Sequence, residues 1–177
     1  MGDVLTYAEE VTRSMTMLAQ HPKTLFVGQS VRYDGQRLHQ TLNGVPMDKR
    51  IEFPVIEDFQ LGFCLGLALE GFIPVSIYPR WDFLLLAANQ LVNHLDKTPA
   101  GFGPKVIVRT AAAHTEPLDP GPQHRQDYTA AFRSMLNTVR VISLDSPEHV
   151  YPGYCEALES SGPVLVVEHM KHYDRTH

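Results

Sequence analysis

Cysteine is scarce in this chain, which has Cys64 and Cys155 and no others among its 177 residues. Two cysteines in unrelated contexts provide neither the disulfide framework of a small secreted domain nor a thiolate zinc site. We therefore expect two buried thiols in a protein that folds without cross-links.

Long apolar runs and clusters of basic residues are also missing. The longest apolar stretch, residues 83–88, is far too short to cross a bilayer, and the N-terminus has no basic segment followed by an apolar run. The formal net charge is -5 and no basic cluster is longer than Lys49-Arg50, so the chain provides no field for a polyanion. We expect a cytoplasmic protein whose partners are neither membranes nor nucleic acids.

The composition is that of a folded α/β protein. Hydrophobic residues make up 44% of the chain and charged residues 20%, a balance typical of soluble globular domains. A chain of this length can bury roughly 70% of its unfolded surface. We therefore expect a single domain, residues 1–177, with its own core.

Helical and strand-like segments alternate along the chain. Thr6, with Glu9 three residues later, has the pattern of a capping box at the start of a helix that runs to about residue 20. Further helices are expected at 58–69, at 82–95 with Asp82 as its cap, and at 147–160 with Ser146 as a candidate cap. Short apolar runs predict strands at 24–27, 73–78, 105–109, 138–144 and 164–168.

This alternation predicts a three-layer α/β/α domain with a mostly parallel sheet. In such sheets, ligands bind beyond the carboxyl ends of the strands, where loops lead into helices. The loops at 28–53, 54–58, 79–82 and 110–126 are therefore the places to look for a site. The last is unusual because His114, Asp119 and His124 lie in it among prolines and glycines.

Three short segments stand out by their order and spacing. They are PVIE at 54–57, followed by a helix with Gly62 and Gly66; DFL at 82–84, leading to NQLVN at 89–93; and GPQHRQ at 121–126, with GPVLVVEH at 162–169 closing the domain. Together they resemble the pyrimidine-binding domain of the transketolase superfamily, which has the thiamine diphosphate-binding fold. In particular, they resemble the beta subunit of the decarboxylase component of 2-oxoacid dehydrogenases. The resemblance covers nearly the whole chain.

The resemblance implies roles for three side chains. The family's glutamate at the position of Glu57 hydrogen-bonds a nitrogen of the aminopyrimidine ring and so activates thiamine diphosphate, a task suited to a partly buried carboxyl group. Phe83 matches the aromatic residue that stacks on this ring, and His124 matches a histidine that faces the substrate. We therefore expect Glu57 and His124 to be catalytic, and Glu57 and Phe83 to bind the cofactor.

Simpler roles compete with these. Glu57 can be a first-turn acid that complements a helix dipole, Phe83 a core side chain, and His124 a solvated loop residue. A metal site made of His114, Asp119 and His124 is disfavoured, because their separation is not a recognised ligand spacing. The histidines of the C-terminal segment are expected to form a surface tail; they are His169, His172 and His177.

Four positions or segments depart from the family pattern. Ile56 stands where a small residue is common, Phe59 where glycine is common, and Gln29 where an acid often follows the first strand. A glycine-rich stretch of the family is replaced by AAAHTEP at 111–117. These positions surround the substrate, so we expect the difference from the family to concern the substrate more than the cofactor.

The diphosphate half of the cofactor site has no match here. The family holds the diphosphate and Mg²⁺ on a second domain through a Gly-Asp-Gly sequence and a downstream asparagine, and this chain offers only GDV at 2–4. It also ends where the family's beta subunit continues into a C-terminal domain. We therefore expect that domain to be absent. We also expect a heterodimer or heterotetramer in which a diphosphate-binding partner subunit provides the main ligands of Mg²⁺. Residues 28–53, 58–69 and 82–95 would make the contacts.

The resulting hypothesis is an enzyme subunit, active only with its partner, that acts on a 2-oxo acid or a ketose. The reaction would be decarboxylation, carboligation or ketol transfer. A split sulfopyruvate or phosphonopyruvate decarboxylase is disfavoured by the GPQH segment. The alternative is a non-catalytic paralogue that binds or regulates a partner subunit, against which the presence of Glu57 argues, because a scaffold has no need for an acid there.

Overall fold

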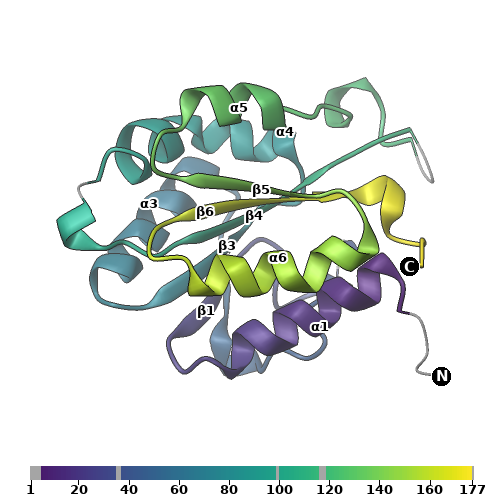
Figure 1. Cartoon of the computed structure of the whole chain (residues 1–177), viewed down its shortest axis with the longest axis horizontal. Helices are drawn as coiled ribbons and strands as arrows, with labels where there is room; N and C mark the ends of the chain where they lie inside the picture. Colours follow the sequence, from purple (N-terminus) through teal and green to yellow (C-terminus); the bar gives the residue numbers. More distant parts are fainter. Residues whose placement is uncertain (1–4, 35–36, 99, 116–118, 177) are drawn as a thin grey trace.

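Six parallel strands form a single sheet with helices on both faces in the computed structural model, which describes residues 5–34, 37–98, 100–115 and 119–176 (Figure 1). The strand order is β2-β1-β3-β4-β6-β5. The strands are β1 (Thr24–Gly28), β2 (Arg50–Glu52), β3 (Ile73–Ile77), β4 (Ile107–Ala112), β5 (Arg140–Leu144) and β6 (Val164–His169). The predicted three-layer α/β/α architecture is confirmed, and every strand pair of this sheet is parallel.

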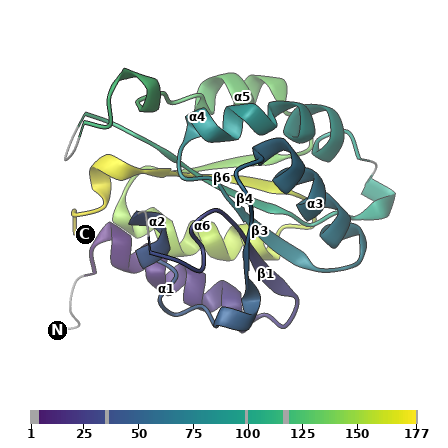
Figure 2. The same ribbon diagram turned by 180° about the vertical axis from the view of Figure 1, so that it is seen from behind.

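The first two helices and the last one cover one face of the sheet, and the three helices between them cover the other. One face carries α1 (Tyr7–Gln20), α2 (Arg37–Gln40) and α6 (Pro147–Glu159), as Figure 2 shows from behind. The other carries α3 (Glu57–Leu69), α4 (Trp81–Leu84) and α5 (Thr129–Met135). Short 3-10 turns η1 (Met47–Lys49), η2 (Leu85–Ala87), η4 (Ala100–Phe102), η5 (Pro122–His124) and η6 (Met170–His172) and the π-helix η3 (Gln90–Leu95) complete the elements.

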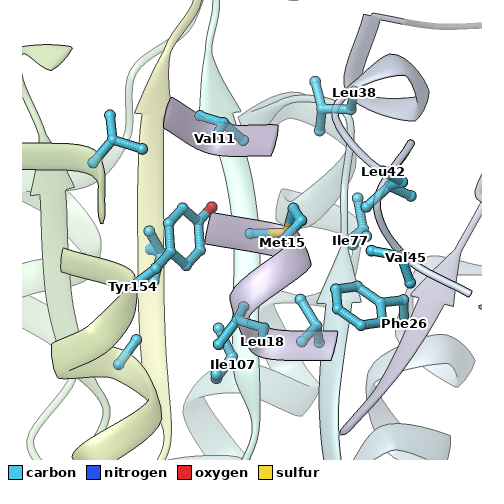
Figure 3. Packing of buried hydrophobic residues seen from close by; sticks show 14 of the residues in the cluster. Val11, Met15, Leu18, Phe26, Leu38, Leu42, Val45, Ile77, Ile107 and Tyr154 are labelled. Atoms are coloured by element: carbon cyan, nitrogen blue, oxygen red, sulfur yellow. The ribbon is translucent and has the colours of Figure 1, made fainter. Parts of the chain in front are cut away.

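Successive residues of a strand belong to two separate hydrophobic cores, because the side chains of a strand point alternately to its two faces. Phe26 and Ile107 pack with α1 and α6, whereas Val27 and Val108 pack with α3 to α5. In Figure 3, side chains of α1 lie over the strand residues of the first core. Each fully buried aliphatic or aromatic side chain contributes about 1.5–3 kcal/mol.

The segment 28–53, expected to be a loop, contains α2, η1 and the edge strand β2. The contacts of Arg50 explain how this segment is held in place. Its guanidinium is buried and donates hydrogen bonds to the carbonyl oxygens of Val31, Leu42 and Val45. Hydrogen bonds from this buried charge to carbonyls along the segment hold the segment against the sheet. No local pattern in the sequence indicates these contacts.

The expected helix 82–95 is interrupted, and this prediction was partly wrong. It consists of α4, η2 and η3, and Asp82 lies inside α4, since Arg80 occupies the N-cap position. Glu57 is the first residue of α3 and not the residue before it. α5 was not anticipated from the sequence, because it spans only 7 residues. Cys64 is buried as expected, but Cys155 is partly exposed.

The two ends of the described chain lie together. The capping box predicted at Thr6 and Glu9 is present at the start of α1. Thr6 forms an antiparallel bridge with Thr176, and the Tyr173 ring stacks on Tyr7 at a centroid distance of 5.5 Å. Among the described helices, none is long and apolar enough to cross a membrane.

Candidate functional site

Glu57 occupies the carboxyl edge of the sheet at the start of α3, just after β2. Its side chain is 5% exposed, and its Oε1 accepts a hydrogen bond of 3.2 Å from the amide Nε2 of Gln29, which follows β1. The Tyr78 hydroxyl, just after β3, donates to the Glu57 backbone carbonyl at 3.2 Å. Groups that follow neighbouring strands therefore fix both the backbone and the carboxyl group of Glu57.

A buried polar layer beneath Glu57 holds the first turn of α3. The Gln60 amide is fully buried and lies 3.1 Å from both the Ser76 hydroxyl and the Ile77 carbonyl. The Ser76 hydroxyl in turn lies 3.2 Å from the Tyr78 hydroxyl. Burial raises the pKa of Tyr78 well above its usual value, so its hydroxyl stays protonated and can donate to Glu57.

The loop after β1 is shaped by Glu52 at the end of β2. The Glu52 carboxylate accepts hydrogen bonds from the backbone N–H groups of Ser30, Val31 and Arg32, at 2.6, 2.9 and 2.9 Å. Ser30 has a positive φ of 54°, an uncommon conformation that these bonds stabilise. Glu52 thereby holds the loop that presents Gln29 to Glu57, a supporting role that no motif in the sequence indicated.

Phe83 and His124 lie against one another at the same edge. Their ring centroids are 5.4 Å apart with an interplanar angle of 30°. Phe83 belongs to α4, which follows β3, and His124 ends η5, which follows β4. The structure thus brings together two residues that the sequence linked only through the family resemblance. Both side chains are half-buried, and the fully buried core side chains of α4 are instead Trp81 and Leu84.

A tight turn directs His124 towards Phe83. Gly121 has a φ of 86°, which favours glycine, and its carbonyl accepts the His124 backbone N–H at 3.1 Å. Asp119 accepts the Gly121 N–H at 2.9 Å and pairs with Arg125 at 3.0 Å. The His124 Nδ1 is buried and has no hydrogen-bond partner among the described residues, which is uncommon for a buried polar atom.

Glu57 lies on α3, which is linked to this ring pair through packed neighbouring elements. α3 packs against η2 and η3, which continue from α4, and α4 packs against η5. Glu57, Phe83 and His124 therefore follow the carboxyl ends of β2, β3 and β4, on elements in successive contact. The helix-dipole role of Glu57 also fits its place in the first turn, but the adjacent Asp58 fills that role from an exposed position.

The surface tail expected for the last histidines is wrong for His169 and His172, which are 6% and 8% exposed; His177 lies outside the described residues. β6 continues to His169, whose Nε2 contacts the Ser143 hydroxyl at 2.9 Å and Asp145 at 3.2 Å. η6 then turns back, so that Tyr173 enters the core.

His114, His169 and His172 form a group at the ends of β4 and β6. Their ring centroids are 5.9 Å apart for His114 and His169 and 6.1 Å for His169 and His172. Burial lowers the pKa of each, so all three favour the neutral form. Among the described residues, no three His, Cys, Asp or Glu side chains are arranged to hold a metal ion.

Known proteins resemble this chain in sequence and in fold. No protein-family model matches the chain. The pyruvate dehydrogenase E1 component subunit beta of Staurastrum punctulatum is 26% identical over 160 residues, covering 86% of this chain and 48% of that protein. The chloroplastic subunit beta-3 of Arabidopsis thaliana is 28% identical over 128 residues, covering 70% of this chain and 31% of that protein. The chain thus spans about half the length, or less, of these relatives.

A solved structure shows the same fold. It is described as a split gene transketolase, inactive beta4 tetramer, with a TM-score of 0.70 and 16% identity over 93% of this chain and 51% of that chain. The chain therefore shares the fold of that transketolase chain. In sequence it resembles the beta subunit of the pyruvate dehydrogenase E1 component, which confirms the resemblance found in the sequence analysis.

Proposed function

We propose that this chain is the pyrimidine-binding subunit of a split thiamine diphosphate-dependent enzyme that acts on a 2-oxo acid or a ketose. The observation that carries the proposal is the buried and hydrogen-bonded Glu57 carboxyl group, at the same edge of the sheet as the stacked Phe83 and His124. A buried acid next to an aromatic face is the combination that a flat nitrogen heterocycle requires. The relatives named as E1 beta subunits support the choice of cofactor.

The side chains present fit the aminopyrimidine half of the cofactor. Within the described part of the chain, the Gln29 amide is the one hydrogen-bond donor to the Glu57 carboxylate, which leaves acceptor positions for a ring N–H. Phe83 would stack on the ring. The diphosphate and Mg²⁺ would be held by the partner subunit, since an oxygen-rich site suits that hard cation.

Each residue then has a task that its surroundings support. When bound, thiamine diphosphate supplies the electron sink for breaking a bond next to a carbonyl group. Glu57 would share a proton with the ring nitrogen, and the Gln29 amide would keep its carboxylate oriented. His124, whose Nδ1 has no partner among the described residues, would hold or move a proton at the substrate. His114, His169 and His172, grouped at the ends of β4 and β6, would extend the polar edge of the site.

A partner subunit is proposed from the apolar surface around Glu57. Val55, Ile56 and Phe59 are exposed at the start of α3, and Leu85 and Leu86 are exposed on η2, which packs against α3. Apolar side chains grouped around a polar site are typical of an interface. The solved split gene transketolase, whose beta chains form an inactive tetramer, supports a requirement for the partner. We propose a heterodimer or heterotetramer in which this chain provides the pyrimidine-binding domain.

The test is Glu57→Gln in the complex of the chain with its proposed diphosphate-binding subunit. We expect turnover of 2-oxo acids and ketose phosphates, with added thiamine diphosphate and Mg²⁺, to fall about 100-fold or more, because a general acid–base group is lost. Asp58→Asn is the matched control, since Asp58 is the exposed neighbour in the same turn. Full turnover by Glu57→Gln would refute the catalytic role, and a native complex without any turnover would favour the non-catalytic alternative.

A further inference from the structure

A cavity of about 380 Å³ lies at the amino-terminal edge of the sheet, at the opposite end of the strands from Glu57. Its lining comes from segments just before β1, β3 and β4. Pro22, Ala68 and Phe72 give it apolar walls. Its volume is within the usual range of small-molecule sites, roughly 300–1,000 Å³.

The charged groups of this cavity are all basic. His21, Lys23 and Lys105 line it, and no Asp or Glu occurs among the described residues of its lining. A cavity with apolar walls and only basic charged groups is complementary to an apolar molecule that carries one negative charge.

Lys105 has the clearest need for a counter-ion. Its side chain is half-buried, and burial lowers its pKa to about 8; among the described residues it forms no ion pair. An ammonium group that loses hydration without gaining an ion pair is destabilised in its charged form. An anion bound in the cavity would remove this penalty.

Capping of helix ends accounts for only part of this arrangement. The Lys105 ammonium donates to the carbonyl of Ser160, which ends α6, and Lys49 donates in the same way to His21 at the end of α1. Lysine contacts of this kind stabilise helix C-termini. However, an ammonium group has three donors, and the Ser160 carbonyl is the one acceptor of Lys105 among the described residues.

We propose that this cavity binds a small carboxylate with an apolar body. The carboxylate would pair with Lys105 and Lys23, and the apolar part would lie on Phe72 and Ala68. The site would be separate from the Glu57 edge, although α3 runs between them, with Glu57 as its first residue and Ala68 near its end. Binding would need neither the partner subunit nor turnover.

The test is calorimetric titration of the full chain with phenylacetate, with the neutral phenylacetamide as the matched probe. We expect saturable binding of phenylacetate at pH 7 and binding at least about tenfold weaker of phenylacetamide, because only the former has a charge for Lys105. Phenylacetate binding should also weaken about tenfold between pH 7 and pH 9.5, as Lys105 loses its proton. Lys105→Met should weaken phenylacetate binding by a similar factor, whereas Lys97→Met, at an exposed position just after η3, should not.

Other outcomes would overturn the proposal. They are the absence of saturation by phenylacetate in the millimolar range, equal affinity for the two probes, and equal loss in the Lys105 and Lys97 variants. Phe72→Ala provides a second reading if Lys105→Met does not fold. This change on the exposed apolar wall should weaken phenylacetate binding and leave the pH dependence of that binding intact. Because the chain is titrated alone, these results do not depend on the proposed enzymatic function.

Discussion

Arg109 of β4 donates two hydrogen bonds, of 2.8 and 3.1 Å, to the carboxylate of Glu168 on β6, and both side chains are fully buried. The Tyr154 and Tyr173 hydroxyls also donate to Glu168. This network joins the two strands just below His169. Removing one partner of a buried ion pair leaves an unpaired charge in the core, which is far more damaging than the pair itself is stabilising.

We therefore expect Arg109→Met and Glu168→Gln each to lower the free energy of unfolding by about 3–5 kcal/mol. The double variant should lose less than the sum of the two, because no charge then remains unpaired. Urea unfolding of the four proteins gives the coupling energy directly. Additive losses would show that the two groups stabilise the fold independently.

The stacking of Phe83 on His124 predicts a change in cofactor affinity. Phe83→Leu keeps an apolar side chain but loses a ring face worth about 0.5–1.5 kcal/mol, so thiamine diphosphate should bind the assembled complex about 2- to 10-fold more weakly. Phe102→Leu, an exposed aromatic at the opposite edge of the sheet, is the control. If the two variants bind thiamine diphosphate with equal affinity in a cofactor titration, Phe83 does not contact the cofactor.

The parts of this fold that could be predicted from the sequence depend on local patterns. β1, β3 and β6 are short apolar runs because both of their faces are buried, and α1 has its capping box. β2 depends on the contacts of Arg50 with carbonyls up to 19 residues away, which no local pattern shows. α2 and β2 were therefore missed for a physical reason.

The candidate site divides in the same way. Glu57, Phe83 and His124 were found through motifs, and the structure places them on elements in successive contact. The bond between Gln29 and Glu57 and the burial of His169 and His172 depend on contacts between segments far apart in the chain. For His172, the packing of Tyr173 on Tyr7 draws the C-terminal segment into the core, whereas His169 is buried at the end of the inner strand β6. Such side chains are found only once the fold is known.

The buried histidines predict a pH dependence of stability. Burial lowers the pKa of His169 and His172 in the folded state, so between that folded value and about 6.5 the unfolded chain binds more protons. Stability should therefore be unaffected by these groups above about pH 6.5 and should fall as the pH drops below it. His172→Gln should reduce this slope in urea unfolding at several pH values, whereas His94→Gln, at an exposed position, should leave it unchanged. An unchanged slope in His172→Gln would mean that its burial does not control its protonation.

Two helical glycines should respond in opposite ways to the same substitution. A Cβ added at Gly66 in α3 meets nothing within 4 Å, so Gly66→Ala should stabilise the chain by about 0.5–1 kcal/mol through helix propensity. A Cβ at Gly153 in α6 would lie 2.4 Å from Leu144 Cδ2, in a core where Leu144 is fully buried. There, overpacking of about 1–3 kcal/mol should outweigh the gain in propensity. In thermal unfolding of the chain alone, the midpoint temperature should rise for Gly66→Ala and fall for Gly153→Ala. Equal shifts in the two variants would show that α6 can move away from β5 at little cost.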